Sequence, residues 1–171
     1  MSVAAIIALG TLAAVLAVMA GEAVLSSFNA SVLRARGAVE PPDDVYRAMQ
    51  WAYPLGFVAL AIEGALRGPS PEPALAAGIL VFGLAKALKA WVITSLGTRW
   101  TFRVLVPPGA PLVAAGPYRW LRHPNYLAVA GEIAGAALLV GAFVSGALFL
   151  VGFGWLMRRR IAVEERALGR R

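Results

Sequence analysis

The chain contains no cysteine and only one histidine, His123, among its 171 residues. Disulfides and thiolate metal sites are therefore excluded, and a metal site built from several histidines is impossible. Charged residues are also scarce, at 15%, whereas 60% of the residues are hydrophobic and the mean hydropathy is +0.73. A soluble domain of this size cannot bury so much apolar surface. These shortages nearly exclude a water-soluble enzyme and indicate a membrane protein.

The apolar runs predict the architecture. One membrane-spanning helix needs about 20 residues, so the chain has room for about four to six spans and no separate soluble domain. Apolar runs cover 3–21, 51–66 and 74–96, and the run 126–157 fits a tight helical hairpin that breaks at Gly141 or at Ser145-Gly146. We predict an all-α polytopic integral membrane protein with about five transmembrane helices, forming one domain over 1–171. The 18 glycines suit close helix packing and permit a homodimer.

The segments between these runs are polar. We expect a loop over 26–50 with a short helix starting at Asp43, a long loop over 97–125, and a tail from Arg158 that continues the last helix. The net charge is +7, which in a soluble protein would suggest nucleic acid. In a membrane chain, positive charge instead marks cytoplasmic loops. We therefore expect a membrane partner and no nucleic acid.

The positions of the basic residues predict the orientation. With five spans, 13 of the 16 Lys and Arg fall on one side. They are Arg34, Arg36, Arg47, Arg99, Arg103, Arg119, Arg122, Arg158, Arg159, Arg160, Arg166, Arg170 and Arg171. This asymmetry predicts an N-terminus outside and a C-terminus in the cytoplasm.

The stretch from Gly116 to Tyr126 reads Gly-Pro-Tyr-Arg-Trp-Leu-Arg-His-Pro-Asn-Tyr and holds the only imidazole. Pro124 biases His123 toward extended backbone, so a helix should start after it and leave free N–H groups there. Aromatic rings and guanidinium groups beside a helix start suit a small molecule with a carboxylate or phosphate and a ring. A juxtamembrane anchor would show the same composition.

A second charged segment runs from Arg160 to Leu168. Arg160 and Glu164 are spaced as helical i,i+4 partners, and the adjacent carboxylates of Glu164 and Glu165 suit ribose hydroxyls or a cationic group. A solvated helix end would also explain this segment.

Two further features lie within the apolar runs. Lys86 and Lys89 are three residues apart and share one helix face. Glu132 is an acid within a span, which is costly unless the acid is paired or functional, and Lys89 or Arg122 are its predicted partners.

Taken together, the pattern Gly-Pro-Tyr-x-x-x-Arg-His-Pro-x-Tyr, a hairpin and then Arg-x-x-x-Glu-Glu-x-x-Leu resembles the isoprenylcysteine carboxyl methyltransferase family. The resemblance extends upstream over 89–109 and reaches 22–37. It implies an integral membrane methyltransferase that uses S-adenosylmethionine in a cytosolic pocket and lacks the glycine fingerprint of dinucleotide-binding folds.

The resemblance also implies roles for individual residues. Residues 97–171 would form the cofactor-binding half, and 1–96 the three N-terminal spans with their loops. The cofactor would contact Gly116, Tyr118, His123, Pro124, Tyr126, Leu127, Arg160, Glu164 and Glu165. We assign candidate catalytic roles to Arg122, His123 and Glu132, and the acceptor side to Glu22, Asn29, Lys89, Trp100 and Arg103. No metal is expected.

The run from His123 to Glu132 is similar to a bacterial branch associated with O-methylation of long-chain alkylpyrone or alkylresorcinol lipids. That branch usually carries histidines in its second span region, where this chain has Tyr46 and Tyr53. The acceptor would be a lipophilic carboxylate, which needs no base, or a phenol or enol, which gains from one. Two alternatives are an NADPH-dependent membrane reductase of the sterol-reductase superfamily and a non-enzymatic membrane protein.

Overall fold

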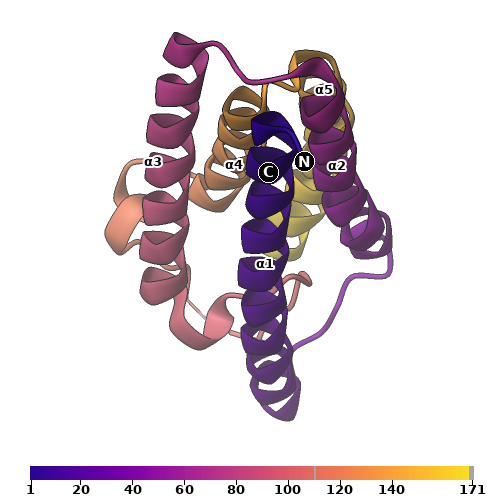
Figure 1. Ribbon diagram of the computed structural model, residues 1–171. Coiled ribbons are helices and arrows are strands. Elements are labelled where there is room, and N and C mark those ends of the chain that lie inside the picture. Colours follow the sequence, from indigo (N-terminus) through magenta and orange to yellow (C-terminus); the bar gives the residue numbers. More distant parts are fainter. Residues whose placement is uncertain (110, 170–171) are drawn as a thin grey trace.

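Five long α-helices dominate the computed structural model, which describes residues 1–109 and 111–169 (Figure 1). They are α1 (Val3–Ala35), α2 (Tyr46–Arg67), α3 (Glu72–Leu96), α4 (Pro124–Val140) and α5 (Phe143–Ala167). Two short 3-10 helices, η1 (Gly97–Arg99) and η2 (Gly116–Arg119), lie in the loop between α3 and α4. The described residues contain no strand, only an isolated bridge between Val39 and Val106. The all-α class is confirmed.

The first helix is longer than its apolar run, so the expectation of a loop starting at residue 26 was wrong. α1 continues to Ala35 because its polar residues are satisfied on its buried face. The Ser26 hydroxyl accepts a hydrogen bond from the Phe102 amide at 2.7 Å. The Asn29 side chain donates to the Trp100 carbonyl at 2.8 Å. Contacts with a distant loop therefore keep this polar segment helical.

The second helix merges two expected elements. α2 starts at Tyr46 and passes through Pro54 to Arg67, so the predicted short helix near Asp43 and the span 51–66 are one helix. At its start, the Asp44 carboxylate accepts a hydrogen bond from the Tyr46 amide at 3.1 Å. An acceptor in this place satisfies a backbone N–H that has no partner within the helix.

The hairpin between α4 and α5 was predicted correctly. The break is at Gly141, which adopts a left-handed conformation with φ +71°, whereas Ser145-Gly146, the other suggested break, lies inside α5. The Glu63 carboxylate accepts hydrogen bonds from the Val144 and Ser145 amides at 3.1 and 2.6 Å. A carboxylate at the start of α5 also complements the helix dipole.

Glycines allow α3 and α4 to pack closely. A Cβ atom on Gly135 would lie 2.5 Å from the Phe82 backbone nitrogen, and one on Gly78 would lie 2.6 Å from that of Leu139. Gly131 and Gly135 form a Gly-x-x-x-Gly pattern on α4, which permits close backbone approach between helices in a membrane. The α3–α4 pair thus forms a tightly packed unit within the bundle.

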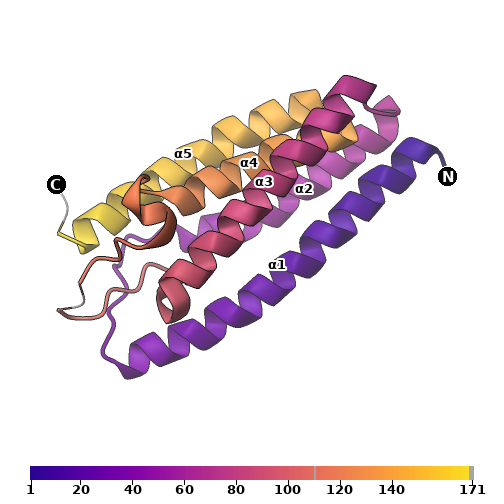
Figure 2. The same cartoon turned by 90° about the vertical axis from the view of Figure 1, so that its left-hand side faces the viewer.

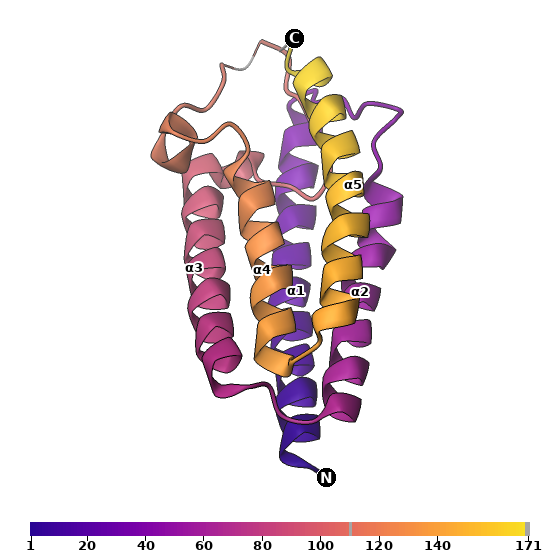
Figure 3. The ribbon, with the colours of Figure 1, turned by 90° about the horizontal axis from the view of Figure 1, so that it is seen from above.

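Different segments lie at the two ends of the bundle (Figures 2 and 3). We call the end that carries the last turns of α5 and the loops 36–45, 97–109 and 111–123 the loop end. The opposite end, which carries the N-terminus and the turns 68–71 and 141–142, is the turn end. The described basic residues predicted to share one side lie at the loop end or in the last turns leading to it, and Arg170 and Arg171 lie outside the described residues.

Within the described residues, two helical segments are long and apolar enough to cross a membrane. They are Val3–Ala35 and Glu72–Arg99, whose most apolar 18-residue stretches have mean hydropathies of 2.6 and 1.7, and α4 is apolar but shorter, at 17 residues. α5 is apolar only as far as Met157, after which Arg158, Arg159 and Arg160 follow. The five helices are therefore present, while the expected five membrane spans stay a prediction.

Candidate functional site

The loop end holds a cleft of about 160 Å³ between the α3–α4 loop and the last turns of α5. We call it the loop-end cleft. Its polar lining includes Tyr118, Arg122, His123, Asn125, Arg160 and Glu164. The two sequence motifs therefore meet in space, as the resemblance implies. The helix start after His123 is also confirmed, since α4 begins at Pro124.

Hydrogen bonds join the two motifs across this cleft. His123 Nε2 lies 3.1 Å from Glu165 Oε1. The Tyr126 hydroxyl donates to Glu164 at 2.9 Å and accepts from Arg160 Nε at 3.1 Å. Arg160 and Glu164, predicted as direct i,i+4 partners, thus both meet the Tyr126 hydroxyl. The two motifs are held as one polar unit.

A residue that the sequence did not single out completes this unit. Asp44, just before α2, accepts from Arg160 Nη1 at 3.3 Å and from the Val104 amide at 3.0 Å. The side chains of Asp44 and Arg160 are 3% and 9% exposed, so the pair is almost fully buried. Asp44 therefore holds the Arg160 guanidinium from the segment just before α2. Its position before a helix was the available signal, but its partner is 116 residues away.

The phenol of Tyr118 stays protonated in this cleft. Burial raises its pKa, and the nearby Glu164 carboxylate raises it further. Tyr118 therefore offers a neutral hydroxyl donor beside the carboxylates of the second motif.

A second cavity, of about 280 Å³, lies deeper in the bundle, and we call it the bundle cavity. α1, α2, α3, α4, α5 and the loop after α3 all contribute to its walls. The lining is mainly apolar and includes the rings of Tyr46, Tyr53, Trp100, Phe102, Tyr126 and Phe153. Its charged lining groups are Glu22, Lys89 and Arg160. A cavity of this kind suits a mainly apolar ligand that ends in a ring or another flat group with polar atoms.

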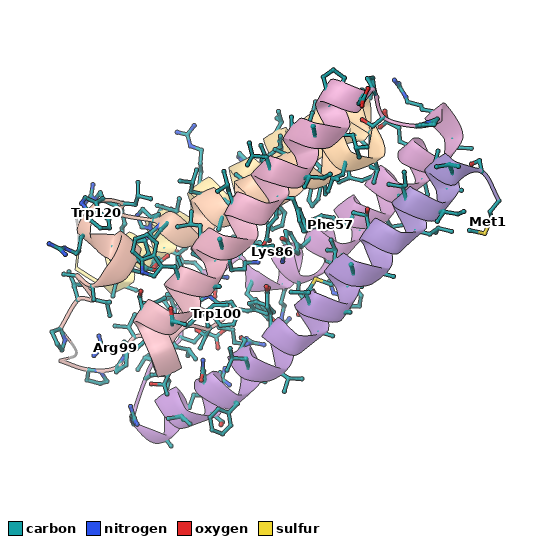
Figure 4. The ribbon with its side chains drawn as sticks, turned by 60° about the vertical axis from the view of Figure 1, so that its left-hand side comes forward. Met1, Phe57, Lys86, Arg99, Trp100 and Trp120 are labelled. Carbon is teal, nitrogen blue, oxygen red and sulfur yellow. The ribbon has the colours of Figure 1, made fainter. Side chains whose placement is uncertain are left out.

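An ionic cluster lies against the bundle cavity. Glu132 lies 2.8 Å from Lys89 and 2.9 Å from Lys86, and it also accepts a hydrogen bond from the Tyr53 hydroxyl. Glu22 of α1 lies 3.1 Å from Lys89 and 3.5 Å from Lys86. The predicted pairing of Glu132 with Lys89 is confirmed, and so is the shared face of the two lysines. Figure 4 shows Lys86 near the middle of α3.

The alternative prediction, that Glu132 pairs with Arg122, was wrong. Its side chain is 70% exposed at the loop end and lies 3.8 Å from Glu165. The loop that precedes α4 points outward, so Arg122 stays near the surface while Glu132 faces α3.

The two cavities share a wall. Trp100, Thr101, Asn125, Tyr126 and Arg160 line both of them. The Trp100 indole donates to the Asn125 side chain at 3.3 Å, and Trp100 is only 3% exposed. A ligand in the loop-end cleft and one in the bundle cavity would therefore contact the same few side chains and lie next to each other.

Four other predicted site residues line neither cavity, and three of them fix the backbone around the cavities. The φ of Gly116 is +58°, and a Cβ there would lie 2.0 Å from Ser95, so the backbone and the space require glycine. Pro124 is buried at the start of α4, and Asn29 holds the loop after α3. Leu127 is 54% exposed and is not a lining residue of either cavity.

Arg103, expected on the acceptor side, lines the loop-end cleft instead. It lies 2.6 Å from Glu40 and 4.4 Å from the centre of the Tyr46 ring. Partial burial raises the pKa of Glu40, but hydrogen bonds from Arg103 and Arg34 outweigh this, so its pKa lies below the ordinary value. Within the described residues, no group of three His, Asp or Glu could hold a metal ion.

Two similar proteins cover nearly the whole chain. "Uncharacterized protein YpbQ" of Bacillus subtilis strain 168 is 33% identical over 149 residues, covering 87% of this chain and 89% of that protein. An "Uncharacterized protein" of Haemophilus influenzae is 24% identical over 159 residues, covering 92% of each. No solved structure matches the chain significantly.

The family comparison covers the part of the chain that contains both motifs. The description "Isoprenylcysteine carboxyl methyltransferase (ICMT) family" matches residues 76–170, which is more than half of the 171 residues. The matched part runs from α3 through both motifs and the hairpin between them. The chain belongs to the isoprenylcysteine carboxyl methyltransferase family.

Proposed function

We propose that the protein is an S-adenosylmethionine-dependent membrane methyltransferase that O-methylates a lipophilic acceptor. The five side chains that line both cavities are the observation that carries this proposal, because they place the two cavities next to each other. Methyl transfer requires donor and acceptor to lie adjacent and in line, and most of the protein's contribution is to hold them so. The whole chain would act as one domain, with residues 97–171 holding the cofactor.

The residues of the loop-end cleft fit the cofactor chemically. Members of this family use S-adenosylmethionine in general, and the bound cofactor supplies a methyl group already activated on a sulfonium. Arg160 offers a guanidinium to its carboxylate, and Glu164 offers an acceptor to its ammonium group or ribose hydroxyls. Glu165 is not a lining residue but contacts His123, which is one, and would offer a further acceptor. His123 and Tyr126 hold these carboxylates in place. Arg122, which also lines the cleft, would offset the negative charge of the nearby Glu165 carboxylate.

The bundle cavity fits a lipophilic acceptor. Its mainly apolar walls and six aromatic rings suit a ring-bearing lipid such as an alkylpyrone or alkylresorcinol, and this favours the branch that the run from His123 to Glu132 resembles. A polar cofactor would enter from the aqueous loop end, and a lipid would enter sideways from the bilayer. Lipid extracts of a strain lacking the gene should contain a lipid lighter by one methyl group.

Binding of S-adenosylhomocysteine, the demethylated cofactor, tests the proposal. Calorimetry in detergent micelles should show binding to the wild type and weaker binding to His123→Ala and Glu164→Ala. Asp43→Asn is the matched control, because Asp43 forms an exposed ion pair with Arg166 at the same end of the bundle. Equal affinity in all four proteins would overturn the assignment of this cleft. A melting-temperature increase with NADPH alone would favour a reductase.

The proposed site also sets the proposed orientation. We infer that the loop end faces the cytoplasm of a bacterial cell, because the cofactor is made there and because the basic residues gather at this end. A reporter fused to the C-terminus should then be active in the cytoplasm. A reporter active only outside the membrane would contradict the orientation.

A further inference from the structure

Glu22 is the carboxylate of the ionic cluster that a ligand in the bundle cavity can reach. It lines the cavity, and its side chain is 10% exposed, whereas Glu132 lines neither cavity and its side chain is 1% exposed. The two acids therefore differ in access although both contact Lys86 and Lys89. This difference bears on the proposed function, on which the inference rests.

The two carboxylates also differ in whether their free acceptor positions are accessible. Glu132 Oε2 accepts from Tyr53 and from Lys89, whereas its Oε1 lies 2.9 Å from Lys86 without a hydrogen bond from any described residue and is fully buried. Glu22 Oε2 accepts from Lys89 at 3.1 Å, but its Oε1 lies 3.5 Å from Lys86, at the limit of a hydrogen bond. A carboxylate offers about four lone-pair sites, so Glu22 keeps acceptor capacity for a ligand.

The charges around the bundle cavity disfavour an anionic acceptor. The cations are Lys86, Lys89 and Arg160, and the acids that contact them are Glu22, Glu132 and Asp44, with Glu164 sharing the Tyr126 hydroxyl with Arg160. The uncharged titratable groups on the lining are Tyr46, Tyr53 and Tyr126. Each cation therefore already has an acidic partner. A neutral hydroxyl acceptor needs no unpaired cation, but its methylation releases a proton.

We propose that Glu22 is the general base that takes this proton. The acceptor hydroxyl donates to the Glu22 carboxylate, its O–H bond breaks, and the proton forms an O–H bond on Glu22. The acceptor oxygen gains the methyl carbon, and the sulfonium leaves as a neutral thioether with the electron pair of the broken S–C bond. Lys89, 3.1 Å from Glu22 and 2.8 Å from Glu132, holds the base in place.

A series of alkylphenols of graded acidity tests this role. The chain is purified in micelles and assayed by methyl transfer to phenols that share one alkyl chain, from an unsubstituted ring to a dinitro ring already ionised at neutral pH. Glu22→Gln should slow the unsubstituted phenol about 100-fold or more, the usual contribution of a general base. It should not slow the ionised phenol, which has no proton to lose. Glu72→Gln, an exposed acid at the turn end, is the matched control and should match the wild type throughout.

The outcomes separate the role of Glu22 from the proposed function. If Glu22→Gln slows every phenol equally, or none, the base assignment is wrong. A wild type that methylates carboxylates but no phenol also overturns it. S-adenosylhomocysteine binding is measured in parallel, and unchanged affinity of Glu22→Gln shows that the variant is folded. A wild type that binds no S-adenosylhomocysteine overturns the proposed function itself.

Discussion

The loop-end cleft and the bundle cavity share side chains but are built differently. The cleft is held by hydrogen bonds and ion pairs between distant segments, such as Asp44 with Arg160 and His123 with Glu165. The bundle cavity lies among closely packed helices, and one ionic cluster contributes Glu22 and Lys89 to its mainly apolar lining. Under the proposed function, the more polar cavity would hold the polar cofactor and the mainly apolar one the lipophilic acceptor.

The largest expected effect on either cavity is the loss of stability on removing Glu132, the acid at the centre of the ionic cluster. Glu132→Ala would leave Lys86 and Lys89 with Glu22 alone inside the bundle, and breaking a buried pair costs about 3–5 kcal/mol. Thermal unfolding in micelles, followed by circular dichroism, should show a large drop in melting temperature. Glu72→Ala, an exposed acid on α3, should show little change. A Glu132→Ala protein as stable as the wild type would mean that the cluster contributes nothing to the bundle.

A change in the shared wall should affect the cleft first. Tyr126→Phe removes the hydroxyl that joins Arg160 to Glu164. Hydrogen bonds to charged groups contribute about 1.5–3 kcal/mol, so affinity for S-adenosylhomocysteine should fall roughly tenfold to hundredfold. Calorimetry measures this, with Tyr46→Phe as control, because Tyr46 lines only the bundle cavity. An equal loss in both variants would show that the two cavities do not bind separate ligands.

Two neighbouring acids allow a buried ion pair and an exposed one to be compared within the loop end. Asp44 is buried against Arg160, whereas Asp43 pairs with Arg166 while both are more than half exposed. Asp44→Asn should lower the free energy of unfolding by about 1.5–3 kcal/mol. Asp43→Asn should lower it by less than about 1 kcal/mol, since exposed pairs are screened by water and salt. Urea unfolding of both variants checks the ranking, and a reversed order would mean that Asp44 does not anchor the cleft.

Most of the fold follows from local patterns in the sequence. The apolar runs located four of the five helices closely, because an uncharged run of this length is stable only as a buried or lipid-facing helix. The start of α4 after His123 follows from proline geometry, and glycine positions offered Gly141 as one of two possible breaks in the hairpin. The end of α1 could not be located this way, since Ser26 and Asn29 look like loop residues until the loop after α3 supplies their partners.

In the candidate site too, the features that depend on local sequence could be predicted, and those that depend on distant contacts could not. The two motifs could be found because their residues are close in sequence, and the cost of a lone charge in a span predicted that Glu132 has a basic partner, with Lys89 and Arg122 as the candidates. The role of Asp44 could not be found, because its position before a helix indicates a helix start only and its partner lies 116 residues away. Nor could sequence separate Glu22 from Glu132, since their difference in exposure depends on how α1 packs against the other helices.

The smallest expected effect concerns pH and the loop-end segment around Glu40. Its folded pKa lies below the ordinary value of 4.5, so its bonds to Arg103 and Arg34 contribute stability above that pH and lose it as the pH falls through the lowered value. Melting temperatures of the wild type and Glu40→Gln should therefore differ most at neutral pH and converge on acidification. The difference should correspond to at most about 1 kcal/mol, because all three side chains are partly exposed. Curves that diverge on acidification would reverse the sign of the effect and show that Glu40 is held in its protonated form.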